Sequence, residues 1–150
     1  MTDFRISVLI KKPIKTVYQA FIDPDNMVKW TTDLEKFEIV KGKFGEIGAT
    51  ARLYYRQKGR INIMEDKLEY IEPGQKLIST VTGEGLTARV ETNFKDSNGS
   101  TEVVIHWSGK PNRFLLKLLL PFLKNKIKKA ARDELNKFKN LVEQYGAKFK

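Results

Sequence analysis

The chain has 150 residues, the size of one ordinary domain, and a chain of this length can bury a hydrophobic core without covalent cross-links. It contains no cysteine, which excludes disulfides, zinc–thiolate sites and thiol catalysis. The net charge of +10 is uneven: residues 110–150 hold twelve basic and three acidic residues, whereas residues 1–109 hold sixteen and fifteen. The longest apolar run, Phe114 to Leu123, is too short to span a bilayer, and no secretory signal is visible. We therefore expect residues 1–150 to form a single cytoplasmic domain.

Residues 4–32 predict one strand followed by two short helices. Residues 4–10 alternate apolar and polar side chains, as a half-buried strand does. Pro13 suits the first position of a helix, which the Asp23-Pro24 pair would end. A second short helix is predicted from Asp25 to about Thr32.

Residues 34–108 predict six strands, because turn residues divide the segment and no helical period is sustained. Asn98-Gly99 is the strongest turn signal, since both central residues of a type I′ hairpin turn need a positive φ. Pro73-Gly74 suits a type II turn. Strands joined by such short turns form an antiparallel meander.

The last forty residues predict a long amphipathic helix from Asn112 to Tyr145, which Pro121 should kink or divide. Its apolar stripe advances by about 3.6 residues per step. The stripe consists of Leu116, Leu120, Leu123, Ile127, Ala131, Leu135, Phe138, Val142 and Tyr145. A twisted seven-stranded sheet cannot touch this helix along its whole length, so an apolar gap is expected between them.

Several short motifs resemble the START-related SRPBCC superfamily, and within it the polyketide cyclase/dehydratase and lipid-transport branch. They are Ile10 to Pro13, Val17 to Pro24, Trp30, Gly45 to Ala49, Tyr70 to Gly74, and Leu135 to Glu143. The resemblance implies an α+β helix-grip fold, in which a curved seven-stranded antiparallel sheet wraps around a long C-terminal helix. The superfamily includes lipid carriers, hormone receptors and cyclases, so the fold does not choose among these functions.

Strand alternation nominates the side chains that face the helix and could line a ligand-binding cavity. Large aromatic or flexible side chains with a polar atom suit an adaptable cavity, which favours Trp30, Tyr55, Met64 and Trp107. The alternative is that these residues are simply core. The candidate ligand-binding residues are Trp30, Leu53, Tyr55, Met64, Asp66, Leu68, Val90, Thr92, Ile105, Trp107, Leu120, Leu123 and Ile127.

Asp66 shares its alternation with Met64, Leu68 and Tyr70, which predicts a carboxylate inside the apolar interior. Its pKa should rise there, and it could orient a ligand hydroxyl or act as an acid or base. The alternative is a bulge near Glu65 that turns Asp66 outward, or a buried pair with Arg52 or Arg56.

The sequence carries no recognisable catalytic or metal-binding motif. His106, the one histidine, is predicted on the solvent face with Glu102 and Ser108. The glycines fit turns and form no phosphate-binding loop. We therefore expect no metal, no cofactor and no catalytic nucleophile.

The basic C-terminal segment allows a further interpretation. Leu115, Leu118, Leu119 and Phe122 form a second apolar patch, which with nearby lysines could rest on an anionic membrane. The alternative is that the Gly45 to Gly48 loop or the short helices cover this patch and the lysines are merely solvated. Nucleic acid is an unlikely partner, since no aromatic residues alternate with the charges.

The leading functional hypothesis is a binding or carrier protein for an apolar small molecule or lipid, held between sheet and helix. One alternative is a cyclase/dehydratase-like enzyme that uses Asp66 and a tyrosine hydroxyl for proton transfer in the same cavity. Another is a membrane-associated accessory protein that acts through the basic C-terminal helix.

Overall fold

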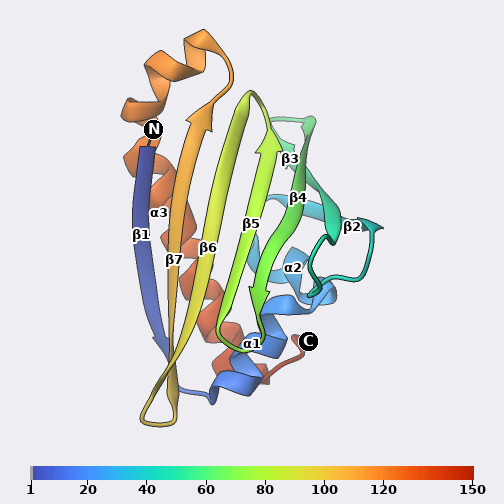
Figure 1. Ribbon diagram of the computed structural model, residues 1–150, viewed down its shortest axis with the longest axis vertical. Helices are drawn as coiled ribbons and strands as arrows, with labels where there is room; N and C mark the ends of the chain where they lie inside the picture. Colours follow the sequence, from blue (N-terminus) through green and yellow to red (C-terminus); the bar gives the residue numbers. More distant parts are fainter. Residues whose placement is uncertain (1) are drawn as a thin grey trace.

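The computed structural model describes residues 2–150, with the exception of the side chain of Leu115. One antiparallel sheet curves around a long helix, and two short helices close one end (Figure 1). The elements in chain order are β1 (Thr2–Ile10), α1 (Ile14–Ile22), α2 (Pro24–Trp30), β2 (Leu34–Lys41), β3 (Thr50–Gln57), β4 (Arg60–Glu72), β5 (Lys76–Gly83), β6 (Leu86–Ser97), β7 (Ser100–Pro111) and α3 (Phe114–Tyr145).

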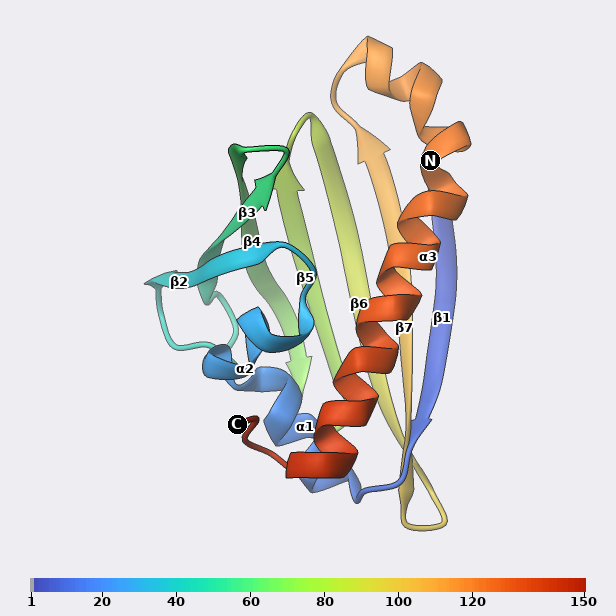
Figure 2. The ribbon, with the colours of Figure 1, turned by 180° about the vertical axis from the view of Figure 1, so that it is seen from behind.

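The seven strands follow the order β1-β7-β6-β5-β4-β3-β2, and every neighbouring pair is antiparallel. The strands from β2 to β7 form the predicted meander. The last strand, β7, also pairs with the first strand, β1, at the edge of the sheet. Helix α3 lies across the concave face, mainly along β1 (Figure 2). The structure confirms the predicted helix-grip fold.

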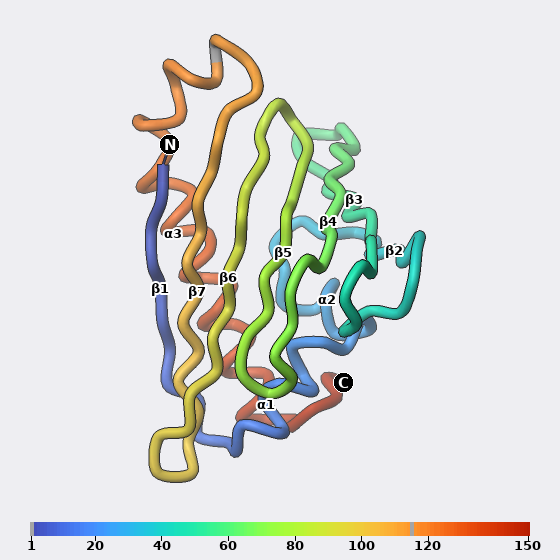
Figure 3. The backbone as a smooth tube through the Cα atoms, viewed as in Figure 1, coloured from blue at the N-terminus to red at the C-terminus, as the bar shows by residue number. Residues whose placement is uncertain are grey.

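The predicted turns at Asn98-Gly99 and Pro73-Gly74 are both present. Asn98 and Gly99 have φ of 52° and 88° between β6 and β7, and the Asp96 carboxylate accepts a hydrogen bond from the Gly99 amide at 3.2 Å. Gly74 has φ of 74° between β4 and β5. Both turns are short, so the backbone reverses directly from β4 to β5 and from β6 to β7 (Figure 3).

The boundaries of the two short helices differ slightly from the prediction. Pro13 is the N-cap of α1 and keeps an extended conformation, so the helix begins one residue later. Asp23 ends α1 and also caps α2, because its carboxylate accepts a hydrogen bond from the Asp25 amide at 2.9 Å. Pro24 then occupies the first turn of α2, where its missing N–H costs nothing.

A β-bulge in β4 overturns the prediction for Tyr70. Leu68 pairs with Ser79, but the next pair is Tyr70 with Ile78, so Glu69 is the extra residue. Side chains after the bulge point to the opposite face from the one that alternation predicts. Tyr70 is therefore 43% exposed and donates a hydrogen bond to Glu72.

Helix α3 remains continuous through Pro121, but its first turns bend away from the axis of the remainder (Figure 2). The bend agrees with the predicted kink, because proline removes one helical hydrogen bond and clashes with the preceding turn. Beyond it, Leu135, Phe138 and Val142 are fully buried in the main core.

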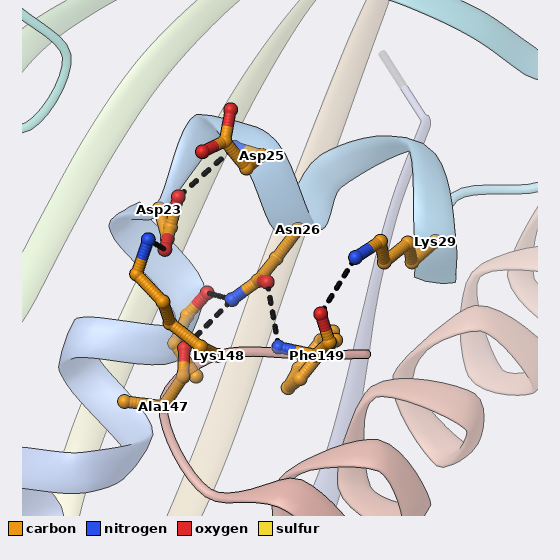
Figure 4. Close-up of polar contacts among 8 residues, drawn as sticks. Asp23, Asp25, Asn26, Lys29, Ala147, Lys148 and Phe149 are labelled. Carbon is orange, nitrogen blue, oxygen red and sulfur yellow. Dashed lines mark hydrogen bonds and ion pairs between the residues drawn. The ribbon is translucent and has the colours of Figure 1, made fainter.

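A network around Asn26 attaches α2 to the residues after α3 (Figure 4). The buried Asn26 amide donates hydrogen bonds to the carbonyls of Ala20 and Ala147, and its oxygen accepts one from the Phe149 amide. Lys29 donates to the Phe149 carbonyl at 2.6 Å. The Phe149 ring is buried against Phe138, with centroids 5.8 Å apart. These contacts fix the position of α2 at one end of the concave face.

Candidate functional site

A cavity of about 490 Å³ lies between the concave face of the sheet and α3. Strands β1 and β3 to β7 supply most of its wall, and α1, α2, α3 and the connecting residues Thr31 and Phe44 supply the rest. Its lining is mainly aromatic and aliphatic, with a few polar side chains among them. A second hollow of about 370 Å³ at the β1 edge has only five lining residues, Arg5 and Arg132 among them, and lacks such apolar walls.

Eleven of the thirteen candidate ligand-binding residues line the cavity. The structure thus brings together side chains that lie far apart in the sequence, but their role in ligand binding stays a prediction. The eleven are Trp30, Leu53, Tyr55, Met64, Asp66, Leu68, Val90, Thr92, Ile105, Trp107 and Ile127.

Leu120 and Leu123 do not line the cavity, so the prediction for these two residues is corrected. Leu120 is buried and Leu123 half-buried, but both precede the part of α3 that borders the cavity, which begins at Ile127. The bend at Pro121 turns the residues before it, Leu120 among them, away from the axis of the remainder, whereas Leu123 lies after the bend and about one turn before Ile127. A straight apolar stripe could not reveal this difference.

Two aromatic clusters contribute to the apolar wall. Trp107 on β7 stacks on Phe4 of β1, with ring centroids 5.1 Å apart, and its ring lies directly over Gly109. Trp30 on α2 packs against Phe21 and Phe138, at centroid distances of 5.5 and 5.0 Å. Packing against neighbouring aromatic rings therefore fixes both tryptophan side chains, and both line the cavity.

Asp66 points into the cavity from the middle of β4, as alternation predicts. It keeps the same orientation as Met64 and Leu68 because the β-bulge comes later in the strand. Burial raises its pKa to about 6, an effect that the nearby Ser79 hydroxyl partly offsets. Neither proposed arginine pairs with it among the described residues, and Arg56 instead pairs with Glu35.

Two further ionisable groups face the same space. Burial, with smaller contributions from the charges of Glu134 and Asp66, holds the pKa of the Tyr55 hydroxyl well above its usual range. Burial also raises the pKa of Glu134, although a hydrogen bond from the Thr32 amide at 2.9 Å partly offsets this. Tyr55 thus stays a neutral hydroxyl near two carboxyl groups, a group able to donate and accept hydrogen bonds.

Three buried polar atoms have no hydrogen-bond partner among the described residues, and all three belong to residues that line the cavity. They are Nε1 of Trp30, Oγ1 of Thr31 and Oδ1 of Asp66. Unpaired buried polar groups are costly and uncommon in proteins, so each calls for an explanation. A ligand with its own polar atoms would provide partners for them.

His106 lies outside the cavity lining, opposite Arg5 on the neighbouring strand. Its Nε2 is 3.9 Å from the Asp3 carboxylate. Within the described residues, no group of three or more His, Cys, Asp or Glu side chains is placed to hold a metal ion.

The sequence predictions missed Glu134, Thr31 and Ser79 as cavity residues. Glu134 carried a usable signal, because it lies seven residues after Ile127 and therefore on the same face of α3. Thr31 ends α2, and Ser79 pairs with Leu68 on the neighbouring strand. Their placement depends on packing and strand pairing, which the sequence pattern did not specify.

The family described as "Polyketide cyclase / dehydrase and lipid transport" matches residues 1–143. The chain belongs to this family. No curated protein matches the sequence.

Solved structures similar to this chain share its fold at low sequence identity. Protein CV1439 from Chromobacterium violaceum is 18% identical, with a TM-score of 0.76 over 95% of this chain and 99% of the other. A START superfamily protein from Mycobacterium smegmatis is 12% identical, with a TM-score of 0.77 and coverage of 95% and 97%. The Zhui aromatase/cyclase from Streptomyces sp. R1128 is 13% identical, with a TM-score of 0.75 and coverage of 95% and 94%. At these identities the similarity establishes the fold alone.

Proposed function

We propose that residues 1–150 form a single ligand-binding domain that binds and carries an apolar small molecule, with lipids as the favoured class. The observation that carries this proposal is the largely apolar cavity of about 490 Å³ between the sheet and α3. Small-molecule sites in proteins typically measure about 300 to 1,000 Å³ and combine apolar walls with a few polar groups. This cavity has both properties.

The unpaired polar atoms of the cavity wall indicate which polar groups a matching ligand would carry. The Trp30 indole can only donate a hydrogen bond, so it would pair with an oxygen of the ligand. The unpaired Asp66 oxygen, when ionised, would accept a hydrogen bond from a hydroxyl or amine. An amphiphile with an apolar body and an oxygen-bearing polar end matches this arrangement.

The first test is the recovery of a ligand from the purified protein by native mass spectrometry and solvent extraction. Ala131 faces the cavity from α3, and Ala131→Trp should fill part of it and reduce the recovered ligand. Asn136→Trp adds the same side chain at an exposed position of the same helix, and should retain the ligand.

A titration with an apolar fluorescent probe provides a second measurement. Trp30 and Trp107 both line the cavity, so binding should change their fluorescence in a saturable way. The proposal is wrong if wild type yields no ligand and shows no saturable response to several apolar probes.

A second candidate function is proton-transfer catalysis in the same cavity. The observation that favours it is Asp66, whose pKa of about 6 leaves both the acid and the base form populated near neutral pH. The neutral Tyr55 hydroxyl would supply a hydrogen bond close to it. A carrier should release its extracted ligand unchanged after prolonged incubation, whereas an enzyme should convert it and lose this conversion in Asp66→Asn.

A further inference from the structure

The first turns of α3 expose an unusual amount of apolar surface. Phe114, Leu118 and Phe122 follow each other at intervals of four residues and are 77%, 55% and 84% exposed. Leu119 beside them is 46% exposed. Side chains four residues apart lie on one face of a helix, so these residues form a continuous apolar patch. The alternative that a loop or the short helices cover the predicted patch is wrong for Leu118, Leu119 and Phe122, and the side chain of Leu115 lies outside the described part of the structure.

A separate face of the same turns is buried. Leu120 is almost completely buried and Leu123 is half-buried, so the helix already rests on the protein through this face. The exposed patch is therefore a second apolar surface of the same turns, and it is not packed against the rest of the protein. Clusters of large exposed apolar side chains usually mark an interaction site.

The surroundings of the patch are strongly basic. Residues 110–132 contain no acidic residue, and within the described residues only Lys129 among their basic side chains forms an ion pair, with Asp133. The eight basic residues are Lys110, Arg113, Lys117, Lys124, Lys126, Lys128, Lys129 and Arg132. An apolar helix face flanked by lysine and arginine matches the interfacial region of an anionic bilayer in both polarity and charge.

The patch lies at one end of the molecule, where the first turns of α3 extend past the end of the sheet (Figures 1 and 2). The chain that leads into it is fixed beside the cavity, because Pro111 pairs with the cavity residue Leu86. The Asn112 amide also donates a hydrogen bond to the Gly85 carbonyl at 2.6 Å. A surface in contact with this patch would thus lie close to the end of the cavity that Leu86 lines.

We propose that the first turns of α3 are a docking surface for anionic phospholipid bilayers, with Phe114, Leu118, Leu119 and Phe122 inserted among the lipids and the basic residues around them in contact with the headgroups. The contact is peripheral, since no helix in the described part of the chain is long and apolar enough to cross a membrane. The bend at Pro121 contributes by directing this short segment away from the rest of α3. This inference does not depend on the ligand proposed for the cavity.

The charge distribution favours a bilayer over a second copy of this chain. In a symmetric dimer through this patch, the eight basic residues of one copy would lie near the eight of the other without acidic partners in the same segment. An anionic bilayer instead provides many negative charges across the whole area of contact.

The test is flotation of the full-length protein with phosphatidylcholine vesicles that contain about 30% phosphatidylglycerol, compared with pure phosphatidylcholine vesicles. Wild type should bind the anionic vesicles, and rising salt should weaken this binding. The apolar variant Leu118→Gln/Phe122→Gln should lower the partition coefficient by at least about tenfold. The charge variant Lys117→Gln/Lys124→Gln should lower it by about 25-fold, at about fivefold for each lysine.

Two matched variants carry the same changes elsewhere. Ile61→Gln/Ile63→Gln removes two exposed apolar side chains from β4, and Lys41→Gln/Lys95→Gln removes two exposed lysines from β2 and β6. Both should bind vesicles within about twofold of wild type, since neither pair belongs to the patch. Circular dichroism melts check that all four variants are folded.

Three outcomes would overturn the proposal. Wild type could fail to bind anionic vesicles at low salt, or the matched variants could lose as much binding as the patch variants. Sedimentation could also show a wild-type dimer that Leu118→Gln/Phe122→Gln converts to a monomer, which would identify the patch as an interface between copies of this chain.

Discussion

The Asp66 carboxyl is a source of instability near neutral pH. Its pKa is 3.8 in an unfolded chain and about 6 in the folded protein, because burial disfavours its charged form. The folded state therefore binds the proton more tightly than the unfolded state does. Stability from this group is fully present below pH 3.8, and it is lost as the pH rises toward and through 6.

We predict that Asp66→Asn stabilises the protein by about 2 to 3 kcal/mol at pH 7 and has little effect near pH 4. The substitution removes the charge that burial opposes while keeping a polar side chain of similar size. Urea unfolding of both proteins from pH 4 to pH 7.5 measures the difference. Parallel pH profiles for the two proteins would show that Asp66 has an ordinary pKa and is not buried as described.

Individual side chains differ in how far the sequence could place them. Alternation placed Asp66 correctly because the strand is regular from Met64 to Leu68, whereas one extra residue at Glu69 reversed the orientation of Tyr70. Nothing in the local sequence distinguishes Glu69 from its neighbours as a bulge. Glu134 could have been found, since an acidic residue next to the apolar stripe of a basic helix is an exception that helical spacing makes visible.

At the scale of elements, the position of α2 depends on hydrogen bonds to residues 147–149, which follow α3. The Asn26 side chain is 1% exposed and makes three hydrogen bonds, two as a donor and one as an acceptor. One of them joins α2 to the end of α1, and two join it to residues 147–149. Because α2 also carries Trp30, this network helps to position one wall of the cavity.

We predict that Asn26→Ala lowers the free energy of unfolding by about 2 to 4 kcal/mol, because it leaves buried carbonyl and amide groups without partners. Hydrogen exchange should accelerate at the Phe149 amide before it does in the sheet. Asp25→Ala, at an exposed neighbouring position, serves as a control and should cost far less. Equal losses in the two variants would mean that the network around Asn26 contributes little.

The sequence predicted the elements themselves better than their relative placement. Nine apolar positions at helical spacing defined α3, and turn residues separated the strands. The same helical spacing assigned Leu120 and Leu123 to the cavity, because a periodic stripe contains no information about where a bent helix leaves the sheet. Pro121 indicated a bend but not its direction.

At the scale of the whole molecule, the side chains that line the cavity lack packing partners on the side that faces it. Residues on nine of the ten helices and strands line it, and they would be better packed with a ligand between them. A ligand that binds only the folded state stabilises it by mass action, by about 2.7 kcal/mol at a free concentration one hundred times its Kd.

We predict that saturation with a bound apolar ligand raises the melting temperature by about 5 to 10 °C, given about 2 to 4 °C per kcal/mol for a domain of this size. Differential scanning fluorimetry across a set of fatty acids and aromatic polyketide-like compounds measures the shift. Ala131→Trp should respond much less to the same compounds. If no compound shifts wild type, or if Ala131→Trp shifts equally, the stabilising site is not this cavity.

The hydrogen bonds of Asn26 also have a consequence for the order of events during protein synthesis. Its partners at Ala147 and Phe149 lie 121 and 123 residues further along the chain. In the same way, β1 cannot complete its pairing until β7 has been made. Such distant contacts slow folding, because a long stretch of chain must be ordered before they can form. A nascent chain that ends before residue 147 would therefore hold α2 without its anchor, and a chaperone that binds exposed apolar segments would meet Trp30 and Phe21 during that interval.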